Sequence, residues 1–96
     1  MLNKESDSLT LAAKVFEPQS GRVMEVLTTE PGLQFYSGNF LDGSFSGKAG
    51  KGYKYRSAFC LEAQHYPDAP NKPQFSSVIL KPDQIYKQSI IYRFTV

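Results

Sequence analysis

The chain has 96 residues, of which 41% are hydrophobic and 21% are charged, and its net charge is +2. This composition is typical of one globular domain, and no apolar run approaches the roughly 20 residues that a membrane-spanning helix needs. The N-terminal stretch MLNKESDSLTL has no apolar core of a signal peptide, and the single cysteine, Cys60, excludes an internal disulfide. We therefore expect a cytoplasmic protein with no membrane partner.

Hydrophobic residues near the N-terminus alternate with a period of two, which is typical of β-strands. In SLTLAAKVF (residues 8–16) the alternation predicts one face made of Leu9, Leu11, Ala13 and Val15. The turn-rich EPQSG follows, and then the β-branched and apolar segment RVMEVLTT (residues 22–29). Two such segments around a short turn predict an antiparallel hairpin.

A turn at Pro31-Gly32 precedes a third predicted strand, LQFYSG (residues 33–38). Residues 39–55 are rich in Gly, Ser and Lys, which predicts a long exposed loop. The part KAGKGYKYR (residues 48–56) interleaves basic and aromatic residues, as some proteins that bind single-stranded nucleic acid do. Because the charge of the whole chain is weak, we expect a solvated loop here and no nucleic-acid partner.

The segment SAFCLEAQH (residues 57–65) predicts a fourth strand, with Cys60, Glu62 and Gln64 on one face. Residues 66–75 contain three prolines and are expected to lack regular structure. A short strand is predicted at residues 76–80, and the last strand at residues 88–96. Without a predicted helix, repeat or domain boundary, the fold class is an all-β antiparallel sandwich. Its unpaired outer strands predict self-association or dependence on a partner.

Glu62 is a carboxylate inside an otherwise apolar strand. Its face-mate Cys60 belongs to one of the most frequently buried residue types, so this face is expected to be partly dry. A carboxylate in a partly dry pocket has a raised pKa and suits the work of a general base. The alternative is an ordinary surface glutamate.

Two further patterns lead to no site. GSFSGKA (residues 43–49) is one residue short of a phosphate-binding loop and has Ala49 where Ser or Thr is needed. Cys60 and the only histidine, His65, make two ligands, too few for a metal site. The separation of three residues is expected to place His65 on the strand face opposite to Glu62. We expect no metal and no cofactor.

Two long runs, SGRVMEVLTTEPGLQFYSGNFLDG (residues 20–43) and AFCLEAQHYPDAPNKPQF (residues 58–75), resemble the aldose 1-epimerase family, also called galactose mutarotases. The closing LKPDQIYKQSIIYRF (residues 80–94) shares the resemblance. It implies an all-β supersandwich that interconverts the α and β anomers of aldoses such as glucose and galactose without a cofactor. Glu62 matches the family's general base, and Gln34 matches a residue that contacts sugar hydroxyls.

The chain departs from the family pattern at the acid. The family's acid histidine and further sugar-site residues lie in an N-terminal part that nothing here matches, and His65 does not match that histidine. Residues 1–96 are therefore expected to be the C-terminal portion of such a domain, weak or inactive alone. The alternative is a non-catalytic carbohydrate-binding or assembly module, in which Phe35, Tyr36 or Tyr66 would pack on a sugar face rather than in a core.

Overall fold

A computed structural model describes residues 1–2 and 8–96, so part of the N-terminal stretch MLNKESDSLTL lies outside the described residues. The described residues form five strands: β1 (Thr10–Phe16), β2 (Val23–Thr28), β3 (Gly32–Tyr36), β4 (Cys60–Gln64) and β5 (Ile90–Thr95). Within the described ranges there is no α-helix, and no helix long and apolar enough to cross a membrane. The predicted all-β class is confirmed.

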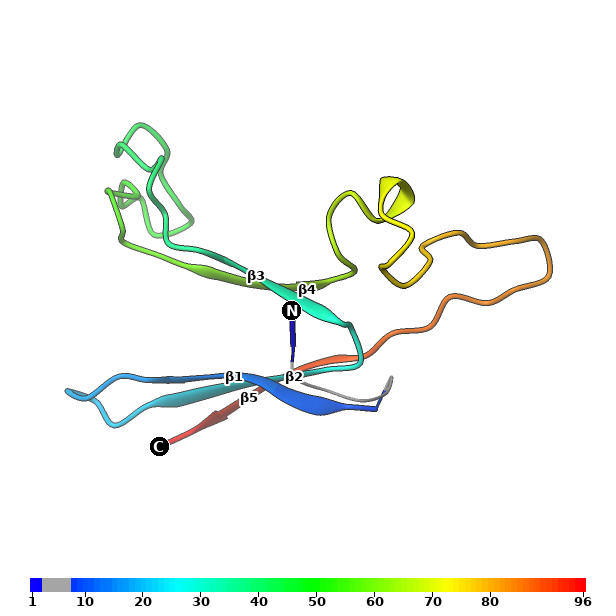
Figure 1. The fold of residues 1–96 in the computed structure, drawn as a ribbon. Coiled ribbons are helices and arrows are strands. Elements are labelled where there is room, and N and C mark those ends of the chain that lie inside the picture. Colours follow the sequence, from blue (N-terminus) through cyan, green and yellow to red (C-terminus); the bar gives the residue numbers. More distant parts are fainter. Residues whose placement is uncertain (3–7) are drawn as a thin grey trace.

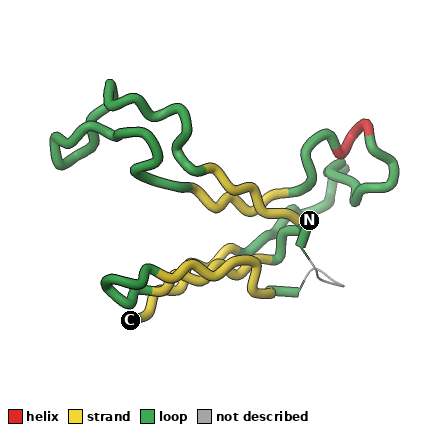
Figure 2. The backbone as a smooth tube through the Cα atoms, turned by 60° about the vertical axis from the view of Figure 1, so that its left-hand side comes forward, coloured by secondary structure: helices red, strands yellow, loops and turns green. Residues whose placement is uncertain are grey.

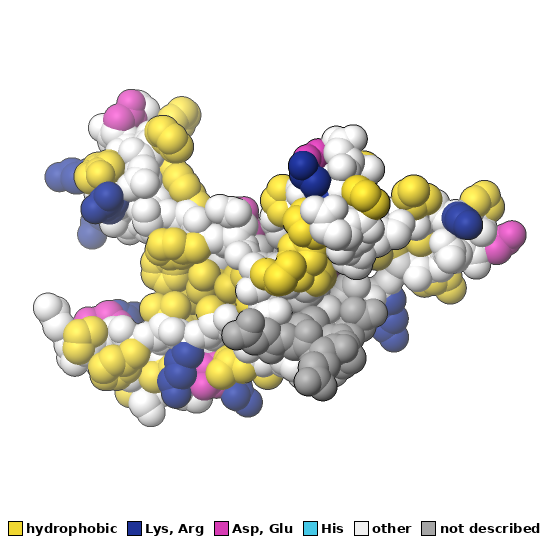
Figure 3. Space-filling model, viewed as in Figure 1, with side chains coloured by type: hydrophobic (Ala, Val, Ile, Leu, Met, Phe, Trp, Pro, Cys, Tyr) yellow, Lys and Arg dark blue, Asp and Glu magenta, His cyan; other side chains and the backbone are white. Residues whose placement is uncertain are grey.

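The strands form two antiparallel layers (Figure 1). One is a three-stranded sheet in the order β1-β2-β5, and the other is the two-stranded sheet β3-β4. Figure 1 shows the chain passing from the first layer to the second between β2 and β3 and returning before β5, and Figure 2 shows the two groups of strands from another side. Hydrophobic side chains gather between the layers (Figure 3), and Val26 of the central strand β2 is fully buried. This arrangement is the predicted antiparallel sandwich.

The predicted hairpin is confirmed in β1 and β2, but the predicted face of β1 is wrong. The register shifts between Leu11 and Ala13, because Leu11 pairs with Leu27 whereas Ala13 pairs with Val26. Since neighbouring residues of β2 point to opposite faces, the shift turns Leu11 away from the face of Ala13. A β-bulge of one extra residue, which no alternation reveals, is the physical reason. Leu11 is accordingly 54% exposed.

The strand predicted at residues 76–80 is not formed, so residues 8–96 contain five strands where six were expected. This segment is β-branched and apolar, but β-propensity reflects packing against neighbouring strands, and no strand lies in register beside it. The proline-rich segment 66–75 also differs from expectation, because Ala69–Asn71 form one 3-10 turn. A proline fits the first turn of a helix, where its missing N–H is not needed.

Residues 37–59 connect β3 to β4 as a long loop, in agreement with the expected exposed loop at residues 39–55. The loop bends back on itself through an isolated bridge between Ser46 and Gly52. The β3-β4 sheet is joined to the three-stranded sheet by the phenol of Tyr92, which donates a hydrogen bond of 2.8 Å to the Leu61 carbonyl. This contact links the edge strand β5 to the strand that carries Glu62.

Candidate functional site

The two residues singled out by the sequence lie side by side. Gln34 of β3 is paired with Glu62 of β4 in the antiparallel register. Directly opposite residues of an antiparallel pair share a sheet face, with Cβ atoms about 4.5–5.5 Å apart. An amide and a carboxylate are therefore presented together, although the long loop 37–59 separates them in the chain. The sequence pattern indicated a strand around each residue but not that the two strands pair.

The environment of Glu62 differs from the expected one. Cys60, Glu62 and their cross-strand neighbour Gln34 are all exposed. The prediction of a partly dry face, which rested on Cys60 being buried, is therefore wrong for these residues. The physical reason is that no part of the described chain covers this face of the two-stranded sheet. Gln34 uses its amide to donate a hydrogen bond of 3.3 Å to the Phe35 carbonyl, so its side chain lies along the sheet surface.

Of the three aromatic residues considered for a sugar face, Tyr36 is on the face of Gln34 and Glu62, where it pairs with Cys60. Its ring stacks on that of Phe40, with centroids 6.2 Å apart. Phe35, which is 60% exposed, points to the opposite face of the sheet. Tyr66 packs against Phe75 with centroids 4.9 Å apart, which is a packing role.

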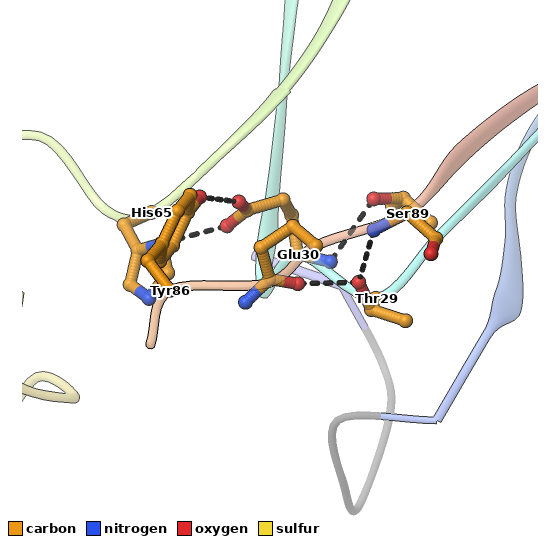
Figure 4. A network of polar contacts seen from close by, with 7 residues as sticks. Thr29, Glu30, His65, Tyr86 and Ser89 are labelled. Atoms are coloured by element: carbon orange, nitrogen blue, oxygen red, sulfur yellow. Dashed lines mark hydrogen bonds and ion pairs between the residues drawn. The ribbon is translucent and has the colours of Figure 1, made fainter. Parts of the chain in front are cut away.

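A polar cluster that the sequence analysis missed lies at one end of the β3-β4 sheet (Figure 4). Its centre is Glu30, which is 3% exposed. The imidazole Nδ1 of His65 lies 2.7 Å from Glu30 Oε2, and the phenol of Tyr86 donates a hydrogen bond to Glu30 Oε1. That hydrogen bond, with burial, raises the pKa of Tyr86. Three segments far apart in the sequence meet here, and the single sequence carries no signal for their pairing.

The cluster is anchored to the three-stranded sheet. The backbone N–H of Glu30 donates a hydrogen bond of 3.0 Å to the fully buried hydroxyl of Thr28. Beside it, Thr29 and Ser89 exchange two hydrogen bonds, Thr29 N–H to the Ser89 carbonyl at 3.1 Å and Ser89 N–H to Thr29 Oγ1 at 2.9 Å (Figure 4). The segment before β3 and the segment before β5 are therefore held together.

A cavity of about 420 Å³ adjoins this cluster, between the end of β4 and residues 77–80. Glu30, His65 and Tyr86 line it, whereas Glu62 and Gln34 do not. The contact of His65 is thus Glu30, and the cavity is separate from the pair predicted to act on a sugar. In the part of the chain that the structure describes, no three His, Cys, Asp or Glu side chains lie close enough to hold a metal ion.

The family model described as aldose 1-epimerase matches residues 2–93. The chain is 48% identical over 93 residues to a galactose mutarotase of Rattus norvegicus and 50% identical over 93 residues to one of Bos taurus, in each case over 97% of this chain and 27% of the relative. It is 34% identical to an aldose 1-epimerase of Escherichia coli (strain K12), over 98% of this chain and 28% of that protein. The chain therefore spans little more than a quarter of the length of these relatives.

Proposed function

The chain belongs to the aldose 1-epimerase family, and we propose on that basis that it carries the general-base part of a site that exchanges the anomers of aldose sugars. Glu62 is the base and Gln34 binds a sugar hydroxyl. The observation that carries this proposal is the register of β3 and β4, in which Gln34 stands directly opposite Glu62. The carboxylate and the amide can then reach neighbouring hydroxyls of one ring.

The proposed reaction proceeds through the open-chain sugar. The Glu62 carboxylate takes the proton of the C1 hydroxyl while an acid protonates the ring oxygen, so that the bond from C1 to the ring oxygen breaks and C1 becomes an aldehyde. Rotation about the C1–C2 bond exposes the other aldehyde face. The hydroxyl made from the ring oxygen then attacks that face and returns its proton to the conjugate base of the acid, and the carboxylic acid of Glu62 protonates the former aldehyde oxygen, which becomes the new C1 hydroxyl. Each positioned proton-transfer group is typically worth about 10²–10⁴ in rate.

The acid is the part that these 96 residues do not supply. The only histidine of the sequence is His65, and its imidazole contacts the buried carboxylate of Glu30. We therefore propose that the chain alone exchanges anomers weakly or not at all, and that the acid is provided by an N-terminal portion of the kind the longer relatives have. The names of these relatives, galactose mutarotase and aldose 1-epimerase, support a hexose such as galactose or glucose as the substrate.

The test is polarimetry of fresh α-D-glucose and α-D-galactose, with and without added imidazole as an external acid. Without imidazole, the wild-type chain is expected to match the uncatalysed rate. With imidazole, we expect acceleration beyond the sum of the separate effects, which is lost in Glu62→Gln and kept in the control Glu25→Gln on the other sheet. If Glu62→Gln accelerates exchange as well as the wild type does, the base assignment is wrong. Acceleration by the wild type without imidazole would refute the proposed lack of an acid.

A second candidate is a non-catalytic carbohydrate-binding module. It is favoured by Tyr36, an aromatic residue on the face of Gln34 and Glu62. Amide NMR shifts on titration with galactose, in the absence of any exchange with imidazole present, would favour this function over the first. A cytoplasmic location and the lack of a nucleic-acid partner stay predictions.

A further inference from the structure

The pairing of Gln34 with Glu62 depends on the register of β3 and β4, and the connection between these strands does not set it. Register in a hairpin is normally fixed by a short turn, whereas residues 37–59 form a long loop. A slip by two residues would leave every side chain on its own face and move Gln34 about 7 Å along the sheet from Glu62. Something else must therefore exclude this slip.

Apolar packing discriminates weakly against a slip by two. The opposite face of the sheet carries only two cross-strand pairs, Leu33 with Ala63 and Phe35 with Leu61. After the slip the same kinds of side chain would still lie on that face, because side chains of a strand repeat with a period of two. Specific contacts at the two ends of the ladder are therefore needed to select one register, and at the loop end the Arg56 N–H donates a hydrogen bond of 3.1 Å to the Gly38 carbonyl.

The Glu30–His65 contact is placed where it can do this. Glu30 lies two residues before β3 begins, and His65 follows β4 directly, so the 2.7 Å contact spans the end of the ladder next to the Gly32–Gln64 pair. We propose that this contact fixes the β3-β4 register, which makes Glu30 and His65 positioning residues for Gln34 and Glu62. The role in catalysis rests on the proposed function, whereas the role in register does not.

Glu30 is a rigid point of attachment. Its side chain is 3% exposed, its backbone N–H is bonded to the buried Thr28 hydroxyl, and its other carboxylate oxygen accepts the Tyr86 phenol. Oε2 accepts no hydrogen bond in the described chain, so the imidazole at 2.7 Å is the polar group that compensates it, and a slip would carry this group away. Burial of an unpaired charged group is strongly unfavourable, so the slipped register is disfavoured.

The backbones of β3 and β4 also leave little space between them at the end of the sheet next to Glu30 and His65. A Cβ atom on Gly32 would lie 3.1 Å from the Gln64 carbonyl oxygen and 3.4 Å from the Tyr66 ring. The two strands therefore approach each other closely beside the contact, which limits the freedom of the His65 backbone relative to Glu30.

Register can be measured directly because the sequence has one cysteine, Cys60. In the observed register Cys60 is opposite Tyr36, and after a slip by two it is opposite Gln34 in one direction and Gly38 in the other. Tyr36→Cys therefore reports the observed register and Gln34→Cys one of the two slipped registers, through the disulfide that each forms with Cys60 in a glutathione buffer. Mass spectrometry gives the fraction of each variant that carries the disulfide. The ratio of the Tyr36→Cys fraction to the Gln34→Cys fraction then measures the preference for the observed register.

Glu30→Ala and His65→Ala are each expected to lower this ratio about tenfold, because each removes the 2.7 Å contact between the imidazole and the buried carboxylate. Glu30→Gln, which keeps an oxygen atom beside His65, is expected to restore much of it. Glu25→Ala on the other sheet is the matched control and should leave the ratio unchanged. Circular dichroism of every variant reports whether the sheets are still formed.

An unchanged ratio in Glu30→Ala or in His65→Ala would overturn the proposal. So would the loss of the sheet signal in both variants, since that outcome assigns the cluster to folding as a whole rather than to register. No sugar enters this experiment, so its failure is separate from a failure of the anomer-exchange assay.

Discussion

At the scale of single residues, two glutamates occupy opposite environments. Glu30 is buried and has a phenol and an imidazole as partners, whereas Glu62 is exposed on an open sheet face. The buried carboxylate therefore suits a structural role, since Oε1 accepts the Tyr86 phenol and Oε2 faces the His65 imidazole. The exposed carboxylate is the one a sugar hydroxyl can reach. In the proposed role as a base, Glu62 would be desolvated by the substrate and by whatever covers this face.

Tyr86 provides a pH-dependent test of the cluster. Its pKa is raised because the protonated phenol donates to Glu30. A group whose pKa is higher in the folded state contributes stability that is fully present below its unfolded pKa, about 10 for tyrosine, and that is lost as the pH rises through the folded pKa. We expect Tyr86→Phe to be less stable than the wild type at pH 8, and the difference to shrink above pH 10. Urea unfolding at several pH values measures this, and a difference independent of pH would contradict it.

At the scale of elements, the three-stranded sheet carries a row of charges across its strands. Lys14 of β1, Glu25 of β2 and Arg93 of β5 lie in register, with Glu25 3.5 Å from the lysine and 2.6 Å from the arginine. Opposite charges on directly opposed residues stabilise a sheet modestly. The row also favours the observed order β1-β2-β5, because Glu25 of the central strand satisfies both neighbours.

The pKa of Glu25 is lowered, first by the hydrogen bond from Arg93 and then by the nearby positive charges. A lowered pKa in the folded state means stability that is present above the unfolded value, about 4.3, and that is lost as the pH falls through the folded value. Glu25→Gln should therefore lower the melting temperature slightly at pH 7 and low salt. The effect should vanish near pH 3 and weaken in 1 M salt, because exposed ion pairs are screened. Thermal unfolding followed by circular dichroism checks this, and an effect that persists at pH 3 would contradict it.

The sequence predicted elements better than it predicted their pairing. Alternation identified β1, β2 and β5, and the hairpin followed from the short turn between the first two. The bulge beside Leu11 was missed because one inserted residue leaves the composition of the strand unchanged. The unformed strand at residues 76–80 shows that propensity requires a neighbouring strand. For the site, the resemblance identified Gln34 and Glu62, whereas the Glu30 cluster depends on tertiary contacts that no local pattern records.

Two glycines with the same backbone conformation allow the cost of a left-handed backbone to be distinguished from the cost of a steric clash. Gly38 and Gly50 have φ values of +70° and +68°. A Cβ on Gly38 would lie 2.8 Å from the Ala58 carbonyl oxygen, whereas a Cβ on Gly50 meets nothing within 4 Å. Both alanine variants bear the left-handed backbone cost of roughly 1 kcal/mol, and Gly38→Ala should lose about 2–3 kcal/mol of unfolding free energy in total. Urea unfolding of the two variants tests this, and equal losses would show that the loop yields to the added methyl group.

At the scale of the whole molecule, the described chain is extended. Its radius of gyration is 16.7 Å, against about 13 Å for a compact domain of 100 residues. Val26 and Ala69 are the buried hydrophobic residues of the described part, while large apolar side chains are exposed along all of β5. Each sheet of a sandwich buries its apolar face against another layer, and these side chains have no such layer in a chain that spans 27% of the length of its relatives.

The outer edge of β5 is the place where we expect association. β5 ends the sheet order β1-β2-β5, and an unpaired edge with exposed apolar residues favours pairing with another strand. In sedimentation velocity, the wild-type chain should shift to larger species as its concentration rises. Phe94→Lys, on β5 and 70% exposed, should reduce this shift, because a charged side chain at an edge opposes strand pairing. Ile85→Lys is the matched control, since Ile85 is 90% exposed but lies outside the strands. Equal reduction by both variants would indicate general hydrophobic association, and a monomer at every concentration would show that this edge stays unpaired in solution.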